Sequence, residues 1–212
     1  MAHRTRHLLL LASALAGAYA ATGRRWQLHW GASASEVAAP LPGDEQVPAA
    51  HLVATRAITV RAPAERVWPW IAQLGQGRGG FYSYDRLENL VGCDIHSADH
   101  VEPAWQHPQV GDPFHLHPEV ALEVVEVDRG HALVVRGAVP AGGTEGAPPY
   151  DFSWAFVVRP QVGTTTARLL VRERYRYTQR WAPALVEPVA VVSFVMTRKM
   201  LHGIRERAER LR

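Results

Sequence analysis

The chain has 212 residues, of which 47% are hydrophobic, and seven are tryptophan. This length and apolar content fit one globular domain with an extension and exclude a disordered chain. The net charge is +3, but no run of basic residues with interleaved aromatic residues marks a phosphate-binding surface, so we expect no nucleic-acid partner.

The N-terminus has the pattern of a targeting segment. Arg4 and Arg6 precede a charge-free, mostly apolar run over residues 8–21 that holds small residues near its end. The run is short for a membrane span of roughly 20 residues, although arginines follow it closely. Residues 1–23 are therefore predicted to be a signal peptide or a membrane anchor, with a buried helix of the domain as a third interpretation. The first two place the protein in the cell envelope, exported or membrane-associated.

Residues 24–50 are predicted to form an extended arm or linker, because Pro40, Pro42, Gly43 and Pro48 interrupt any regular period. Trp26 and Trp30 near its start suit packing on the domain or on a membrane interface. Packing on the domain is the plainer interpretation. The domain itself is expected to span residues 51–212.

The domain opens with a predicted strand over residues 53–60, which is rich in β-branched residues and partly alternates. Pro63 suits the first turn of a short helix over the following residues, which Pro69 should kink or shorten. Ser83 is a candidate N-cap for a second short helix that carries Leu87, Leu90 and Val91.

Strands follow beyond Gly92, divided by Gly, Pro and Asp turns. No helical pattern long enough for a parallel crossover separates them, which predicts an antiparallel meander. A long helix is expected to begin at Pro188 and to turn an apolar stripe toward the sheet. The expected strands cover residues 94–100, 112–117, 120–128, 132–137, 152–158 and 165–177, and the stripe consists of Val189, Val192, Met196, Met200, Ile204, Ala208 and Leu211.

Together with this order of elements, five segments carry a resemblance to a known family: residues 62–70, 79–85, 94–99, 153–156 and 196–201. The chain resembles the SRPBCC superfamily, which includes START lipid-transfer domains, aromatic polyketide cyclases and the birch-pollen allergens. More narrowly, it is similar to the uncharacterised bacterial subgroup of polyketide cyclase/dehydrase type. The resemblance implies an α+β helix-grip fold, in which a curved antiparallel sheet of six to seven strands surrounds a long C-terminal helix. Two short helices follow the first strand, and a ligand cavity lies inside.

Two other motifs point to different chemistry. The glycines of residues 75–80 satisfy the spacing G-x-G-x-x-G, but a helical segment precedes them instead of a strand, which favours a flexible turn over a nucleotide site. His115 and His117 share one strand face, and residues 94–100 hold further aspartates and histidines. No spacing makes these groups converge, and Cys93 is the single cysteine. We therefore expect no metal and no cofactor.

Glu173 is the candidate catalytic residue. If Leu169, Val171 and Tyr175 mark the inward face of the last strand, alternation turns Glu173 inward with them. A buried carboxyl group must find partners or a proton, and it could transfer protons. In the alternative, the neighbouring arginines face inward, or Glu173 makes only a structural ion pair.

Aromatic side chains could wall an apolar pocket, although core packing is the plainer role for any one of them, as for Trp68 and Phe156. The tyrosines beside the Gly-rich turn, with the acid that follows them, suit the rim of the site. The predicted ligand-contact residues are Trp70, Tyr82, Tyr84, Asp85, Trp154 and Tyr175.

Two classes of function remain open. The first is the binding of a small hydrophobic molecule, such as a lipid, an isoprenoid or a polyketide-like compound, in the cavity. The second is a polyketide cyclase/dehydrase-type enzyme that uses an acid/base group in the same cavity. A membrane-tethered scaffold with a vestigial cavity is a third possibility. We favour binding, because no nucleophile constellation or cofactor motif demands catalysis.

Overall fold

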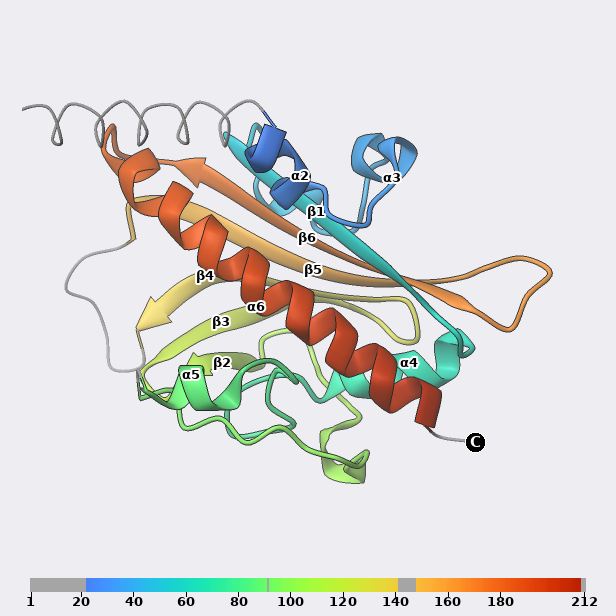
Figure 1. The fold of residues 1–212 in the computed structure, drawn as a ribbon. Coiled ribbons are helices and arrows are strands. Elements are labelled where there is room, and N and C mark those ends of the chain that lie inside the picture. The colour runs from blue at the N-terminus through green and yellow to red at the C-terminus, as the bar shows by residue number, and fades with distance from the viewer. Residues whose placement is uncertain (1–21, 91, 141–147, 211–212) are drawn as a thin grey trace, which may run out of the picture.

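The structure is a computed structural model that describes residues 22–90, 92–140 and 148–210. Its six strands form one antiparallel sheet in the order β1-β6-β5-β4-β3-β2. Helix α6 (Ala182–Arg210) runs diagonally across one face of the curved sheet (Figure 1). The strands are β1 (Leu52–Val60), β2 (Pro113–His117), β3 (Val120–Asp128), β4 (Ala132–Pro140), β5 (Tyr150–Pro160) and β6 (Ala167–Tyr177).

Short helices complete the domain between the first two strands. They are α4 (Ala64–Ala72), α5 (Asp85–Leu90) and the 3-10 turn η3 (Pro103–Trp105). A strand, two short helices, five strands and a long helix follow one another, which confirms the predicted α+β helix-grip fold and its six-stranded sheet.

Both faces of the sheet are covered. The main core lies between the concave face and helices α4 and α6, where Trp70, Phe156 and Ile204 are buried. A smaller cluster on the other face contains Ala57, Val134 and Leu170. Because β1 and β6 are covered on both sides, their burial is nearly continuous instead of alternating.

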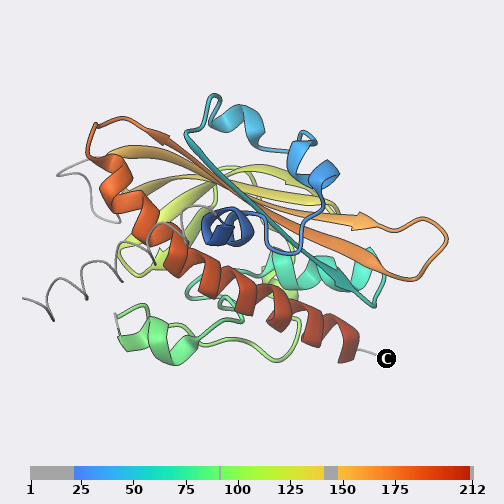
Figure 2. The ribbon, with the colours of Figure 1, turned by 45° about the horizontal axis from the view of Figure 1, so that its top comes forward.

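The segment before β1 lies on both sides of the sheet. Its helix α2 (Arg24–Leu28) packs on the concave side, where Leu28 joins the main core, and α3 (Ala34–Ala38) and the 3-10 turn η2 (Asp44–Gln46) cover the second face. Figure 2 shows α2 between α6 and β1, and Gln27 joins them: its amide donates to Ala190 O of α6, and its carbonyl accepts from Arg56 of β1.

Arginines of β6 bind the arm through ion pairs and hydrogen bonds. The Arg168 guanidinium makes a bidentate ion pair with Glu36 of α3, at 2.6 and 2.9 Å. Arg172 donates to the Asp44 carboxylate at 2.7 Å and to three backbone carbonyls of the arm. These arginines therefore lie on the face opposite to Glu173, and the alternative in which they face the cavity is wrong.

The predicted strand over residues 94–100 is wrong. Asp94 has a left-handed φ of 48°, and side chains replace a strand ladder: Asn89 exchanges two hydrogen bonds with the backbone of Ile95, and Asp85 accepts from Ser97. Because side chains satisfy backbone groups of this polar segment, it does not need to pair with a neighbouring strand.

Helix α6 begins at Ala182, six residues before the predicted start, and Pro188 lies inside it. The proline removes the N–H that would reach Ala184 O, and both residues are exposed, so water can reach that carbonyl group. The predicted stripe is correct for Met200, Ile204 and Ala208 but wrong for Val192, which is 63% exposed. In the first half of α6 the buried stripe consists instead of Val186, Ala190, Phe194 and Thr197.

The second short helix also differs from expectation. The Ser83 hydroxyl does not cap α5 but donates to Met196 O of α6. Leu87 and Leu90 are exposed, while Val91 lies outside the described residues. The glycines at 75 and 80 form a bridge that closes a tight turn, and none of the glycines in this turn lines the cavity described below.

Residues 1–21, which hold most of the predicted signal or anchor, lie outside the described part of the chain. Within the described ranges, no helix is both long and apolar enough to cross a membrane.

The ion pair between α3 and β6 is expected to stabilise the arm. The Arg168 guanidinium holds the pKa of Glu36 at about 2, against an ordinary value of 4.5. Glu36→Gln should therefore cost about 1–3 kcal/mol of unfolding free energy near neutral pH. This stabilisation is present above pH 4.5 and is lost as the pH falls toward 2. Urea unfolding at two pH values measures it, with Glu45→Gln on the same arm as control. Equal stability of the two variants near neutral pH would contradict the role of the pair.

Candidate functional site

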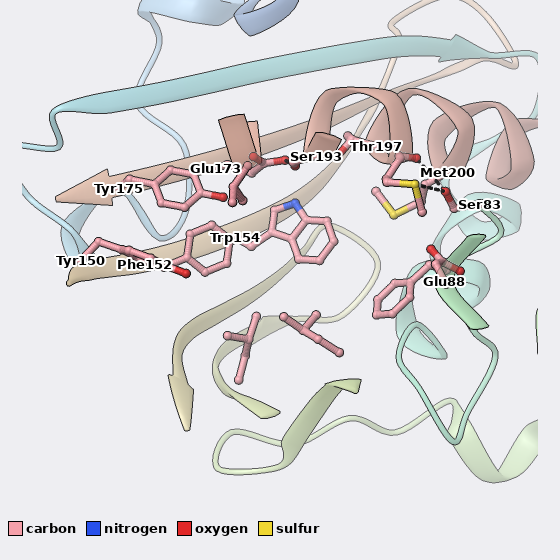
Figure 3. Close-up of a pocket in the computed structure, with 15 residues that line it drawn as sticks. Ser83, Glu88, Tyr150, Phe152, Trp154, Glu173, Tyr175, Ser193, Thr197 and Met200 are labelled. Atoms are coloured by element: carbon pink, nitrogen blue, oxygen red, sulfur yellow. Dashed lines mark hydrogen bonds between the residues drawn. The ribbon is translucent and has the colours of Figure 1, made fainter. Parts of the chain in front are cut away.

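A cavity of about 260 Å³ lies between the concave face of the sheet and the first half of α6 (Figure 3). Most of its lining is apolar or aromatic: Phe81, Leu116, Leu122, Tyr150, Phe152, Trp154, Tyr175, Val189, Met196 and Met200. Its polar lining consists of Ser83, Glu88, Glu173, Ser193 and Thr197. Few polar groups in an apolar wall are typical of small-molecule sites.

Two cross-strand pairs build the wall of the cavity. In the β5–β6 register, Trp154 lies opposite Glu173, and Phe152 lies opposite Tyr175, with ring centroids 4.7 Å apart. Because side chains alternate along a strand, these four residues share the concave face. Glu173 therefore faces inward, as the alternation predicts, and its side chain is 1% exposed.

A buried ion pair holds Glu173. Arg56 of β1, with a fully buried side chain, donates to Glu173 Oε1 at 2.7 Å. From α6, the hydroxyl groups of Ser193 and Thr197 donate to the same oxygen at 2.6 and 3.1 Å. Among the described residues, Oε2 of Glu173 has no partner. This oxygen is left to accept a hydrogen bond from a molecule in the cavity.

The aromatic groups near Glu173 supply hydrogen-bond donors. Burial, and then the nearby charge of Glu173, raises the pKa of Tyr175 well above its ordinary value, so the phenol keeps its proton. Burial also raises the pKa of Tyr150. The indole Nε1 of Trp154 is buried without an acceptor in the described structure. This end of the cavity can therefore offer both donors and an acceptor to a guest.

Glu88 of α5 supplies a second carboxyl group. Figure 3 shows Glu88 near Ser83 at one end of the cavity, Glu173 and Tyr175 at the other, and Trp154 between them. Burial, and then the charge of Asp85, raises the pKa of Glu88 to about 7. Its Oε2 is buried and has no partner among the described residues.

Trp70 and Tyr82 do not line the cavity. They are buried against each other, with ring centroids 5.7 Å apart, and the Arg207 guanidinium lies 4.7 Å from the Tyr82 ring. At Gly203 of α6, the Tyr82 carbonyl oxygen lies 2.3 Å from where a Cβ would stand, so only glycine permits this approach. Tyr82 therefore fastens its segment to α6 as part of the core.

Tyr84 and Asp85 also lie away from the cavity lining. Tyr84 is 40% exposed and borders a shallow surface groove beside Arg198 and His202. Asp85 accepts two hydrogen bonds from Ser97, at 2.7 and 2.8 Å. Of the expected rim, Tyr82 and Asp85 thus hold the fold together and Tyr84 lies at the surface, while Ser83 between them does line the cavity. Of the six predicted ligand contacts, Trp154 and Tyr175 line the cavity.

The histidines and aspartates do not converge. His96 pairs with Asp94 at 3.2 Å, and both are exposed. Across the described ranges, no group of three or more His, Cys, Asp or Glu side chains could hold a metal ion.

The sequence reasoning missed five polar residues of the site: Arg56, Ser83, Glu88, Ser193 and Thr197. Arg56 carried a usable signal, because it alternates with apolar residues on the inward face of β1 and so required a buried partner. Glu88 gave none, since a glutamate on a short helix usually faces water.

The comparisons with known proteins found only distant structural likenesses. No family model and no curated protein matches the chain. Norcoclaurine synthase from Thalictrum flavum, solved with dopamine and hydroxybenzaldehyde, matches 76% of this chain and 88% of its own, at 15% identity and a TM-score of 0.48. A hypothetical protein from Helicobacter pylori matches 81% and 96%, at 12% identity and a TM-score of 0.49. A protein from Mesorhizobium loti matches 74% and 98%, at 14% identity and a TM-score of 0.43.

Likenesses this distant transfer no function to the chain. The architecture seen above, with a curved six-stranded sheet holding one long C-terminal helix, is a helix-grip arrangement. A fold alone does not imply one function, so function must be argued from the site itself.

Because the Arg56–Glu173 pair is buried, removing one partner should be more harmful than removing both. We expect Arg56→Met and Glu173→Leu each to cost roughly 3–5 kcal/mol, since each leaves a buried charge alone. The double variant should lose much less than the sum, since no charge stays behind. Urea unfolding of the four proteins measures this cycle, and additive losses would contradict the pairing.

The raised pKa of Glu88 predicts a pH-dependent stability. Because the folded pKa is about 7 and the ordinary value is 4.5, the folded state binds the proton more tightly, and stability should fall as the pH rises between these values. Glu88→Gln removes this dependence. The melting temperature of the variant minus that of the wild type should therefore increase between about pH 5 and pH 8. If the difference between the two melting temperatures did not change with pH, the Glu88 carboxyl group would be exposed to water and the prediction would be wrong.

Proposed function

We propose that the protein binds a compact, mainly apolar small molecule in the cavity between the sheet and α6. The observation that carries the proposal is the lining itself: an aromatic and aliphatic wall with a few buried polar atoms that lack partners in the described structure. Such atoms gain free energy when a guest supplies the missing hydrogen bonds.

The size of the cavity supports a compact guest. Its volume of about 260 Å³ lies near the lower end of the range of about 300–1,000 Å³ that small-molecule sites occupy. A ring-bearing polyketide-like compound or a short isoprenoid fits this volume better than a long acyl chain. The open volume also counts against a scaffold with a vestigial, side-chain-filled cavity.

Polar groups at the Glu173 end should orient the guest. Glu173 Oε2 can accept a hydrogen bond from the guest, and Trp154 Nε1 can donate one to it, because neither atom has a partner within the described residues. Since both belong to opposite residues of β5 and β6, they lie on rigid elements and fix one end of the molecule.

An enzyme of cyclase type is the second candidate. The observation in its favour is a buried carboxylate beside the Tyr175 phenol in an apolar cavity, where a poly-ketone could be held bent while a proton is moved. Three donors already engage Glu173 Oε1, which leaves Oε2 as the oxygen that would take the proton. Recovery of a chemically changed guest, lost in a folded Glu173→Gln variant, would favour this candidate.

We also propose that residues 1–23 direct the protein to the cell envelope. The support is the sequence pattern of arginines followed by an apolar run. Fractionation of the host with an antibody against the domain tests it, and recovery in the cytosolic fraction alone would contradict it.

Filling the cavity should abolish binding. Met196 lines the cavity, whereas its neighbour Val195 does not and is 45% exposed. Met196→Trp should therefore weaken binding at least about tenfold, and Val195→Trp should not, because only the first indole occupies the space of the guest. Calorimetry with members of a polyketide and isoprenoid panel that raise the melting temperature of the wild type measures this. No thermal shift with any member, or equal affinities of the two variants, would contradict the proposal.

A further inference from the structure

The carboxylate of Glu88 places a negative charge in the cavity lining, and no other side chain of the lining balances it. The lining contains two carboxyl groups, Glu88 and Glu173, and no cationic side chain. The charge of Glu173 is matched by Arg56, which is committed to it and to the arm. Glu88 has no such counter-ion among its described neighbours.

The surroundings of Glu88 make that charge costly. All lining groups of α6 and β2 at this cavity are neutral: Val189, Ser193, Met196, Thr197, Met200 and Leu116. The titratable groups near Glu88 are Asp85 and Cys93, neither of which supplies a positive charge, and His117 lies beside Gly92 in the following turn. A partly buried carboxylate in such a place takes either a proton or a cation.

We propose that Glu88 is a specificity-determining residue that makes the cavity favour compact apolar guests carrying a protonated amine and disfavour those carrying a carboxylate. This inference rests on the proposed binding function. The ammonium group would donate to Glu88 Oε2, which is buried and has no partner in the described structure, while the apolar body of the guest contacts Trp154 and the methionines. A guest carboxylate has no cationic partner in the lining and would meet like charge.

A matched set of probes tests the inference: 2-naphthylmethylamine, 2-naphthylmethanol and 2-naphthoate, which share one ring system and differ in the polar group. Calorimetry with the full chain at about pH 8, where Glu88 is mostly charged, should give an amine affinity about tenfold or more above that of the alcohol. The naphthoate should bind more weakly than the alcohol.

Two variants distinguish the effect of a charge in the cavity on the amine-to-alcohol affinity ratio from the effect of the net charge of the protein. Glu88→Gln should bring the amine-to-alcohol ratio to about one while alcohol binding survives, because only the cation partner is lost. Glu119→Gln makes the same change at an exposed turn outside the lining and should keep the ratio. In the wild type the ratio should fall as the pH drops below the Glu88 pKa of about 7.

The outcomes distinguish a failure of the proposed role of Glu88 from a failure of the proposed binding function on which it rests. Alcohol binding with an amine-to-alcohol ratio near one in the wild type would overturn the role of Glu88 and leave the cavity as a binding site. A preference for the amine that survives Glu88→Gln would overturn it too. Failure of all three probes to bind would contradict the binding function and this inference together.

Discussion

The buried pair between Arg56 and Glu173 is the interaction on which the rest of the structure depends. It joins β1 to β6 inside the domain, takes in two hydroxyl groups of α6, and reaches the arm through the carbonyl oxygen of Gln27. A charge pair this deep is costly unless its hydrogen bonds are nearly complete. The sheet edge, the long helix and the arm therefore meet at this one buried ion pair.

The same pair shapes the cavity. Because Ser193 and Thr197 of α6 face Glu173 with polar groups, apolar side chains do not fill that part of the interior, and space remains beside Trp154. The site is consequently asymmetric, with an ion-paired carboxylate at one end and the unbalanced carboxyl group of Glu88 at the other. An apolar wall between two different polar ends favours one orientation of a guest.

The fold could be predicted from the sequence because its signals are local: β-branched alternation, turn residues and a long apolar stripe. Glu173 was found in the same way. The stripe of α6 was misjudged at Val192, since the inward positions of that half include Ser193 and Thr197, which pair with a distant strand. Tyr82 and Tyr84 with Asp85 suggested a site rim, but the place of Tyr82 was decided by its close approach to Gly203. Contacts between segments more than a hundred residues apart leave no periodic trace in the sequence.

Native mass spectrometry of the full chain, purified gently from its own host, tests the central claim most directly. The account predicts one bound small molecule on the wild type and on Val195→Trp, and none on Met196→Trp, whose added indole fills the cavity. The wild type at the mass of the bare chain, or the same guest on the filled variant, would contradict a ligand site between the sheet and α6.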